Sequence, residues 1–139
     1  MKEILGIENE LAQLFEEAHK AAECSYSPYS HFRVGAALQL SNGVVVTGTN
    51  VENVSFGLTI CAERAALFQA VSRFGPKIRV TAVAITNLNQ AASPPCGACR
   101  QVLAEFASSD VPVLFPASEG RRRLTMGELL PAGYEMKLL

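Results

Sequence analysis

The stretch CAERAAL, residues 61–67, places three chemically active side chains at the start of an apolar helix. Cys61, Glu63 and Arg64 fall within the first turn, and helical spacing of apolar residues continues over 62–74 until a Gly-Pro pair ends it. An ordinary structural helix has no need of a thiol, an acid and a guanidinium at one end. This stretch therefore indicates a site at the helix start, and the rest of the chain is interpreted around it.

A second stretch, PPCGACRQVL (94–103), begins a predicted helix over 97–106 and contains Cys96 and Cys99 in a C-x-x-C motif. Near a helix start, residues three apart can face one side, and such pairs often bind zinc. A thioredoxin-like redox role would place the motif after a first strand, whereas here it follows a proline-rich loop late in the chain. With Cys61 as a third thiolate, we expect both helix starts to meet at one metal ion.

The electrostatics of a helix start favour this arrangement. Unpaired backbone N–H groups and the positive end of the helix dipole lower the pKa of a thiol there and so favour the thiolate. Arg64 and Arg100 could add further positive charge beside the three sulfurs.

The number of protein ligands decides what such a metal does. Three ligands leave a fourth position open for catalysis, whereas four make a closed structural site. Cys24 is the candidate for a fourth ligand, with His31 and His19 behind it, and that alternative describes a zinc-stabilised interaction module without chemistry. Cys24 also ends a predicted amphipathic helix, where a single cysteine is most often a small buried apolar residue. Cysteine counting alone leaves both interpretations open.

Glu63 favours the catalytic interpretation. Residues two apart on a regular helix point about 200° apart, so Cys61 and Glu63 face one site only if Cys61 lies at or before the helix cap. Glu63 would then lie beside the metal without binding it, where it could take a proton from an acidified water and return it to a leaving group. Considered alone, Glu63 is an ordinary acid favoured by the helix dipole. Together with PCGAC downstream, it predicts a general acid–base residue.

The remaining elements alternate between helices and strands. Residues 8–23 predict an amphipathic helix, and 25–32 and 87–95 predict loops. Asn42-Gly43 between two apolar runs predicts a hairpin. The predicted strands are 33–40, 43–50, 79–86 and 111–115, and the tail predicts a short helix followed by an extended end. This alternation predicts an α/β layered fold, with residues 1–139 as a single domain.

Composition limits the class of function. The chain has 139 residues, 49% of them hydrophobic, and a net charge of −1, which is a poor match to a polynucleotide. No apolar run reaches the roughly 18 residues that a membrane span needs. The acidic start has no cleavage-like region, so we expect no signal peptide and a cytoplasmic protein. In a reducing compartment, four cysteines indicate metal binding or catalysis rather than disulfides.

The combined motifs resemble a known family. Zinc deaminases carry the pattern H-x-E…P-C-x-x-C, with a variant that uses three cysteines. CAE at 61–63 and PCGAC at 95–99 resemble that variant. YSPYSHFRVGAAL, TGTNVENVSFGLTICAERAAL, PPCGACRQVL and ELLP resemble the small free-nucleoside cytidine deaminases, over most of the chain.

The resemblance implies a three-layer α/β/α fold with a central mixed sheet of about five strands. It implies hydrolytic deamination of cytidine and deoxycytidine, in pyrimidine salvage, with one Zn²⁺ per chain. The implied zinc ligands are Cys61, Cys96 and Cys99, with Glu63 moving protons as C4 is attacked and ammonia leaves. The implied substrate contacts are Phe32, Asn50, Glu52, the Ala62 backbone N–H and Tyr134. Arg64 and Gln101 are implied to support the zinc ligands, and Phe56 to lie between subunits of a homotetramer.

One departure concerns the substrate. Family members usually have phenylalanine where this chain has Tyr134, and LLPAGY also resembles the blasticidin-S deaminases. Those enzymes lack the glutamate of NVEN, which is present here as Glu52, so cytidine and deoxycytidine are the preferred prediction. The basic run at 121–123 predicts a solvated turn rather than a nucleic-acid patch, because the total charge is balanced. A polynucleotide deaminase would need a basic surface that the sequence does not indicate.

Overall fold

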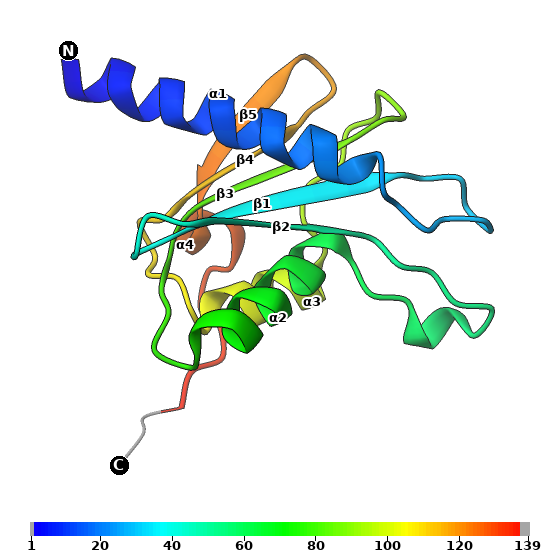
Figure 1. Cartoon of the computed structure of the whole chain (residues 1–139). Coiled ribbons are helices and arrows are strands. Elements are labelled where there is room, and N and C mark those ends of the chain that lie inside the picture. Colours follow the sequence, from blue (N-terminus) through cyan, green and yellow to red (C-terminus); the bar gives the residue numbers. More distant parts are fainter. Residues whose placement is uncertain (1, 137–139) are drawn as a thin grey trace.

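Five strands form one mixed sheet in the order β2-β1-β3-β4-β5, with helices on both faces (Figure 1). The computed structural model describes residues 2–136. The strands are β1 (Val34–Leu40), β2 (Val45–Thr49), β3 (Val80–Asn87), β4 (Pro112–Pro116) and β5 (Arg121–Thr125). The helices are α1 (Lys2–Ala22), α2 (Ala62–Phe74), α3 (Gly97–Ala104), α4 (Met126–Leu129) and the 3₁₀ turn η1 (Phe56–Leu58).

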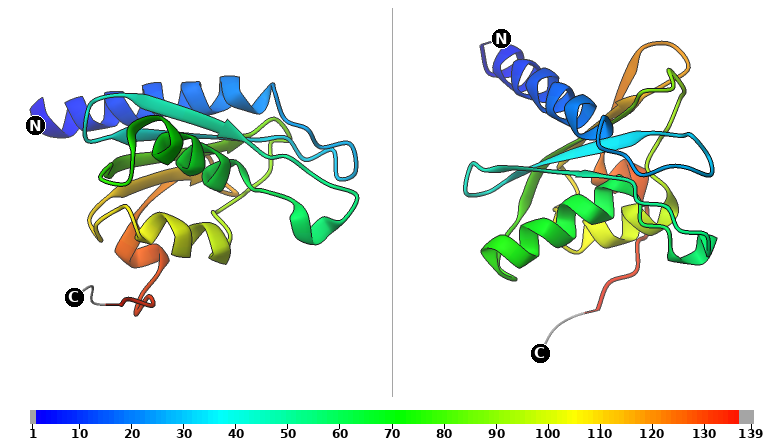
Figure 2. Two further views of the ribbon diagram at one scale, coloured as in Figure 1. Left: turned by 60° about the horizontal axis from the view of Figure 1, so that its bottom comes forward. Right: turned by 45° about the vertical axis from the view of Figure 1, so that its right-hand side comes forward.

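The sheet is mixed because one of its pairs is parallel. β1 pairs antiparallel with both β2 and β3, and β4 pairs antiparallel with β5. β3 and β4 are parallel, which requires a crossover connection, and α3 lies in that connection. Figure 2 shows α1 on one face of the sheet and α2 with α3 on the other. The predicted three-layer α/β/α fold with about five strands is confirmed.

The alternation of side chains along β1 explains the two layers. Ala36 and Leu38 belong to the core cluster shared with α2 and α3, whereas Ala37 belongs to the cluster under α1. Gly35 also faces α1, and a Cβ there would lie 2.5 Å from the backbone nitrogen of Ala22. Small residues on this face therefore let α1 approach the sheet closely.

Several predicted boundaries hold. The helix over 62–74 is α2 with those bounds, and Gly75 follows it in the left-handed region with φ of 87°. The Asn42-Gly43 turn joins β1 to β2, with Gly43 at φ of 86°. α1 begins earlier than predicted, at Lys2, and α3 ends earlier, at Ala104.

The prediction of a turn at 121–123 is wrong, because Arg121, Arg122 and Arg123 form part of the edge strand β5. Three successive arginines give no alternation of apolar and polar residues, and all three side chains are exposed, so the usual sequence signal of a strand is missing. β5 is held instead by its ladder to β4 and by the Arg121 guanidinium, which lies 4.0 Å from the Phe15 ring centre on α1.

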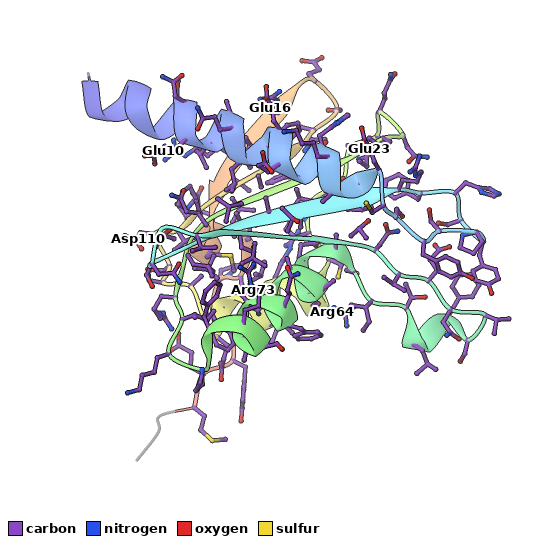
Figure 3. All side chains as sticks on the ribbon, in the orientation of Figure 1. Glu10, Glu16, Glu23, Arg64, Arg73 and Asp110 are labelled. Atoms are coloured by element: carbon purple, nitrogen blue, oxygen red, sulfur yellow. The ribbon has the colours of Figure 1, made fainter. Side chains whose placement is uncertain are left out.

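The outer surface of the α1 layer is acidic. Glu10, Glu16 and Glu23 are all exposed along or just beyond this helix (Figure 3). Within residues 2–136, none of the helices combines the length and the apolar composition that a bilayer crossing needs.

Candidate active site

A cavity of about 360 Å³ opens beside the N-terminus of α2 and the loop that precedes α3. Its wall also includes the loop before β1, the segment after β2 and the end of β3. The residues that the sequence predicted and that line it are Phe32, Asn50, Glu52, Cys61, Ala62, Glu63 and Cys96. Segments far apart in the chain thus bring their polar side chains to one space.

A short β-bridge explains why these side chains share a face. Val51 and Ile60 pair antiparallel, and each backbone N–H donates to the other's carbonyl at 3.0 Å. Successive side chains on such a ladder point to opposite sides, so the residues before and after each bridge partner face one way. Asn50 and Cys61 on one rung and Glu52 and Thr59 on the next therefore point into the cavity.

The two helix starts do meet at the cysteines. Cys61 and Cys96 are the N-caps of α2 and α3, with extended backbones and no side-chain capping bond, so both sulfurs remain free. Their Sγ atoms lie 3.8 Å apart, and the Sγ of buried Cys99 joins them within 4.8 Å. Two thiolates bound at about 2.3 Å to one tetrahedral zinc would lie about 3.8 Å apart. The cluster therefore fits a zinc ion.

The electrostatics of the cluster also fit a cation. A hydrogen bond from the Cys99 thiol, together with Arg64 and Cys96, lowers the pKa of Cys61 to about 5. The same pairing with Cys61, with burial and the nearby Glu63 carboxyl, raises the pKa of Cys99. The Cys61 thiol therefore loses its proton readily, whereas the Cys99 thiol keeps its own. A bound divalent cation would stabilise the thiolate form of all three cysteines together. Three sulfur donors suit zinc.

Two charged residues of the first α2 turn lie beside the sulfurs. The Arg64 Nη2 donates to the Cys61 Sγ at 3.4 Å, and that contact raises the pKa of the guanidinium. Glu63 is 4% exposed and lines the cavity, and desolvation by burial raises the pKa of its carboxyl. A raised pKa makes this carboxyl a stronger base than an exposed glutamate, which suits a residue that accepts and returns protons.

The groups predicted for the sugar are fixed by hydrogen bonds. The Asn50 Oδ1 accepts from the Val34 N–H at 2.9 Å and the Ser25 hydroxyl at 2.5 Å, and its Nδ2 donates to the Phe32 carbonyl at 2.7 Å. One amide hydrogen of Asn50 therefore remains for a ligand. Glu52 is 7% exposed, and its pKa is lowered chiefly by a hydrogen bond from the Ser30 hydroxyl. Its carboxylate stays ionised at neutral pH.

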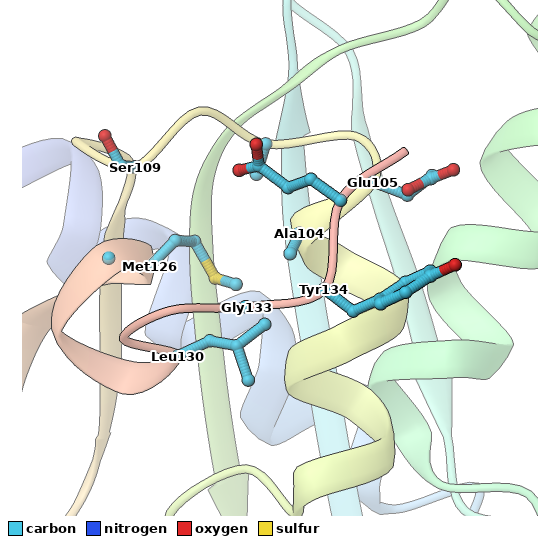
Figure 4. Close-up of a pocket in the computed structure, with 10 residues that line it drawn as sticks. Ala104, Glu105, Ser109, Met126, Leu130, Gly133 and Tyr134 are labelled. Atoms are coloured by element: carbon cyan, nitrogen blue, oxygen red, sulfur yellow. The ribbon is translucent and has the colours of Figure 1, made fainter. Parts of the chain in front are cut away.

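Other predicted residues lie elsewhere on the chain. Tyr134 is 72% exposed and lines a separate, smaller cavity of about 100 Å³ beside α3 and α4 (Figure 4). The Gln101 amide donates to the Tyr134 carbonyl at 3.2 Å, so its hydrogen bond fixes the C-terminal segment. Phe56 is 67% exposed and packs edge to face against Tyr29, with ring centres 6.0 Å apart.

Cys24 does not behave as either interpretation expected. It is exposed rather than buried, in the turn two residues beyond the end of α1. Among the described residues, the cluster of potential metal ligands consists of Cys61, Cys96 and Cys99, without Cys24. The four-cysteine structural site is therefore not formed.

Sequence reasoning missed Thr59. Its hydroxyl is buried at the cavity wall, and no hydrogen-bond partner is found for it among the described residues. The spacing T-x-C before α2 was the available signal, since alternate residues of an extended segment face one side.

Comparisons with known proteins agree with this geometry. Residues 8–115 match a family model described as the cytidine and deoxycytidylate deaminase zinc-binding region. A cytidine deaminase of Halalkalibacterium halodurans is 46% identical over 122 residues, which are 87% of this chain and 91% of that protein.

Solved structures are similar over nearly the same length. The crystal structure of a cytidine deaminase from Burkholderia pseudomallei superposes with a TM-score of 0.80 at 40% identity, covering 88% of this chain and 98% of that one. The cytidine deaminase of Mycobacterium tuberculosis gives a TM-score of 0.77 at 42% identity, covering 90% and 97%.

Proposed function

The chain belongs to the cytidine deaminase family, and on that premise we propose that it hydrolyses cytidine and deoxycytidine to uridine and deoxyuridine, releasing ammonia. The observation that carries the proposal is one cavity with a three-cysteine cluster and a buried glutamate at one end and a fixed amide and carboxylate on its wall. A structural metal site by itself would not need the Asn50 amide and the Glu52 carboxylate in the same cavity.

Glu63 is the proposed proton carrier. When bound by Cys61, Cys96 and Cys99, one zinc ion supplies the Lewis acidity that makes water nucleophilic at neutral pH. The water oxygen forms a bond to C4 of the cytosine ring, and the bond from C4 to the amino nitrogen breaks. Glu63 accepts one proton from the water and delivers it to the ring N3. It then accepts the second proton, from the new hydroxyl on C4, and delivers it to the amino group, which leaves as ammonia. The raised pKa of its carboxyl supports both directions of transfer.

The neighbouring residues are proposed to support that transfer. Arg64 places a fixed positive charge 3.4 Å from the Cys61 sulfur and so offsets part of the negative charge of three thiolates. Ala62 begins α2 and is buried at the cavity, and its backbone N–H is one of the helix-start donors without a partner inside the helix. We assign that N–H to the carbonyl oxygen of the base.

The sugar is proposed to bind at Asn50 and Glu52. Asn50 retains one amide donor and Glu52 offers an acceptor-only carboxylate, so together they can both donate to and accept from sugar hydroxyls. Half-buried Phe32 lines the same cavity and offers a flat surface to the nucleoside.

The resemblance to the family implies an assembly of four copies, and exposed apolar surface on α2 and α3 supports a subunit interface there. A groove of about 410 Å³ there is lined by Leu67, Phe68, Val71, Ser72, Val102 and Phe106. Phe68 is 50% exposed, and a large apolar patch of this kind marks an interaction site. Phe56 and Tyr134, also exposed, are proposed to reach neighbouring subunits. Light scattering on the protein as it elutes from a gel-filtration column measures the mass of the assembly directly.

A cytoplasmic location and a role in pyrimidine salvage are part of the same proposal. Three sulfurs must stay reduced to bind zinc, which suits a reducing compartment. The products, a free nucleoside and ammonia, suit recovery of pyrimidines rather than editing of a polynucleotide.

The test is deamination of cytidine followed by ultraviolet absorbance, with Glu63→Gln as the variant and Glu16→Gln, on the exposed face of α1, as the matched control. Glu63→Gln is expected to lower kcat by about 100- to 10,000-fold, since this is the usual contribution of general acid–base catalysis. The variant should keep one zinc per chain. Wild-type turnover by a zinc-loaded Glu63→Gln protein would refute the role of Glu63. Comparing cytidine, deoxycytidine and blasticidin S defines the substrate.

A further inference from the structure

The loop before β1 supplies a hydroxyl that the proposed reaction leaves without a role. Ser30 lines the cavity next to Glu52. Three hydrogen bonds run from this loop to that carboxylate. The N–H groups of Tyr29 and Ser30 donate to Oε1 at 3.0 and 3.1 Å, and the Ser30 hydroxyl donates to Oε2 at 2.5 Å. The loop thus holds both carboxylate oxygens.

The proton of the Ser30 hydroxyl is fully used. The Phe32 N–H donates to the Ser30 Oγ at 3.0 Å, so this oxygen accepts one bond and gives its only proton to Glu52. Although Ser30 lies at the cavity, it has no donor left for a ligand. The Ser30 proton therefore acts on a bound nucleoside through Glu52, while the Ser30 oxygen keeps one lone pair.

The hydrogen bonds also fix which lone pair of Glu52 remains. Within residues 2–136, Oε1 accepts two N–H groups, whereas Oε2 accepts the Ser30 hydroxyl alone. The terminal torsion of a glutamate is broad, so the carboxylate plane is free to turn unless both oxygens are held. Ser30 is the side chain that donates to it among the described residues, and it directs the remaining Oε2 lone pair.

We propose that Ser30 is a positioning residue of the sugar site, which orients the Glu52 carboxylate so that it accepts a hydrogen bond from a sugar hydroxyl. This inference rests on the proposed function, since it assigns Glu52 to the sugar. The lowered pKa of Glu52, whose largest cause is the same Ser30 hydroxyl, agrees with an ionised acceptor.

The loop has its own anchors, so loss of one hydroxyl leaves it in place. His31 adopts a left-handed conformation with φ of 59°, and its N–H donates to the Ser27 carbonyl at 3.0 Å. The Asn89 amide, beyond the end of β3, donates to the His31 carbonyl and accepts from the Arg33 N–H, both at 2.9 Å. Ser30→Ala should therefore fold normally.

The experiment measures Ser30→Ala on two substrates. Cytidine has both hydroxyls of the sugar diol, whereas 2′,3′-dideoxycytidine lacks the 2′- and 3′-hydroxyls and keeps the 5′-hydroxyl. For cytidine, kcat/KM is expected to fall about 10-fold through KM with kcat nearly unchanged, as for loss of a hydrogen bond to a charged group. For the dideoxy substrate, followed at raised enzyme concentration, the loss should be under about twofold, because the contact that Ser30 directs is already absent. Ser30→Thr should restore cytidine turnover, and Ser41→Ala, in the exposed hairpin turn, is the matched control.

Equal losses on both substrates would mean a general structural role and would overturn the inference, as would an unchanged KM for cytidine. If the wild-type chain deaminates neither substrate, the proposed function fails instead. Calorimetric binding of uridine and 2′,3′-dideoxyuridine then tests Ser30 without turnover, with the same difference expected between the two ligands.

Discussion

Gly48 of β2 lies against the first turns of α2, and replacing it by alanine should damage the cavity more than the fold. A Cβ there would lie 2.6 Å from the Ala62 carbonyl oxygen and closer still to the Ala66 nitrogen. Ordinary contacts begin at 3.4 Å, so β2 and α2 must separate by at least about 0.8 Å. Both neighbours are backbone atoms, which cannot rotate away.

Separating β2 from α2 changes the cavity because each of these elements leads directly into residues of the cavity wall. β2 runs directly into Asn50, and Cys61 is the N-cap of α2, so separating them pulls the proposed sugar wall away from the cysteine cluster. A misplacement of about 1 Å in an active site can cost about 100-fold in rate. We expect Gly48→Ala to lower kcat/KM for cytidine by about that factor, with an overpacking cost of about 1–3 kcal/mol in unfolding free energy.

Gly35→Ala is the matched control, because its Cβ would press against α1 on the opposite face of the sheet, 2.5 Å from the Ala22 nitrogen. Gly35→Ala should lower the free energy of unfolding at least as much as Gly48→Ala does. It should nevertheless lower kcat/KM by less than about fivefold, since the cavity lies on the other face of the sheet. Thermal unfolding by circular dichroism and kcat/KM at 25 °C give both quantities. Activity losses that track stability alike in the two variants would refute the reasoning.

Three further outcomes are expected. Cys24→Ser should keep one zinc per chain, whereas Cys99→Ser should lose it, measured by zinc content after gel filtration; loss of zinc from both would return Cys24 to the ligand set. Thr59→Val should raise KM for cytidine by about 3- to 10-fold while leaving the melting temperature unchanged or higher, because its buried hydroxyl has no partner within the described chain. Phe68→Arg should dissociate the proposed assembly in light scattering, and an unchanged mass would exclude α2 from the interface.

The residues of the cysteine cluster were predictable from the sequence because each of the two motifs that supply them is local, whereas the meeting of Cys61 with Cys96, 35 positions later, depends on how α2 and α3 pack. Cys61 and Cys96 each precede a run with helical spacing, and a residue at the cap has an extended backbone that turns its side chain back towards the helix start. That cap position also lets Glu63 share the cavity, as the spacing argument required. The burial state of Cys24 was not predictable, since a helix end can be covered or open.

Strand β5 and the role of the loop before β1 needed the tertiary structure. Arg121–Thr125 has no apolar alternation, and it becomes a strand because β4 offers a free edge and Phe15 receives the Arg121 guanidinium. In the same way, nothing in YSPYSHF indicates that Ser30 donates to a carboxylate 22 positions later in the chain.

By itself, the sequence determined the α/β class, the bounds of α2 and the set of three sulfurs beside one acid. The helix bounds depend on periodicity, caps and turns within a dozen residues, and the sulfurs and the acid were indicated by two short motifs, CAE at 61–63 and CGAC at 96–99. Tertiary structure alone decided that the bridge between Val51 and Ile60 turns Asn50, Glu52 and Thr59 to the same side as Cys61. The register of a pairing between distant segments depends on the packing of the whole chain around them, and no local pattern contains it.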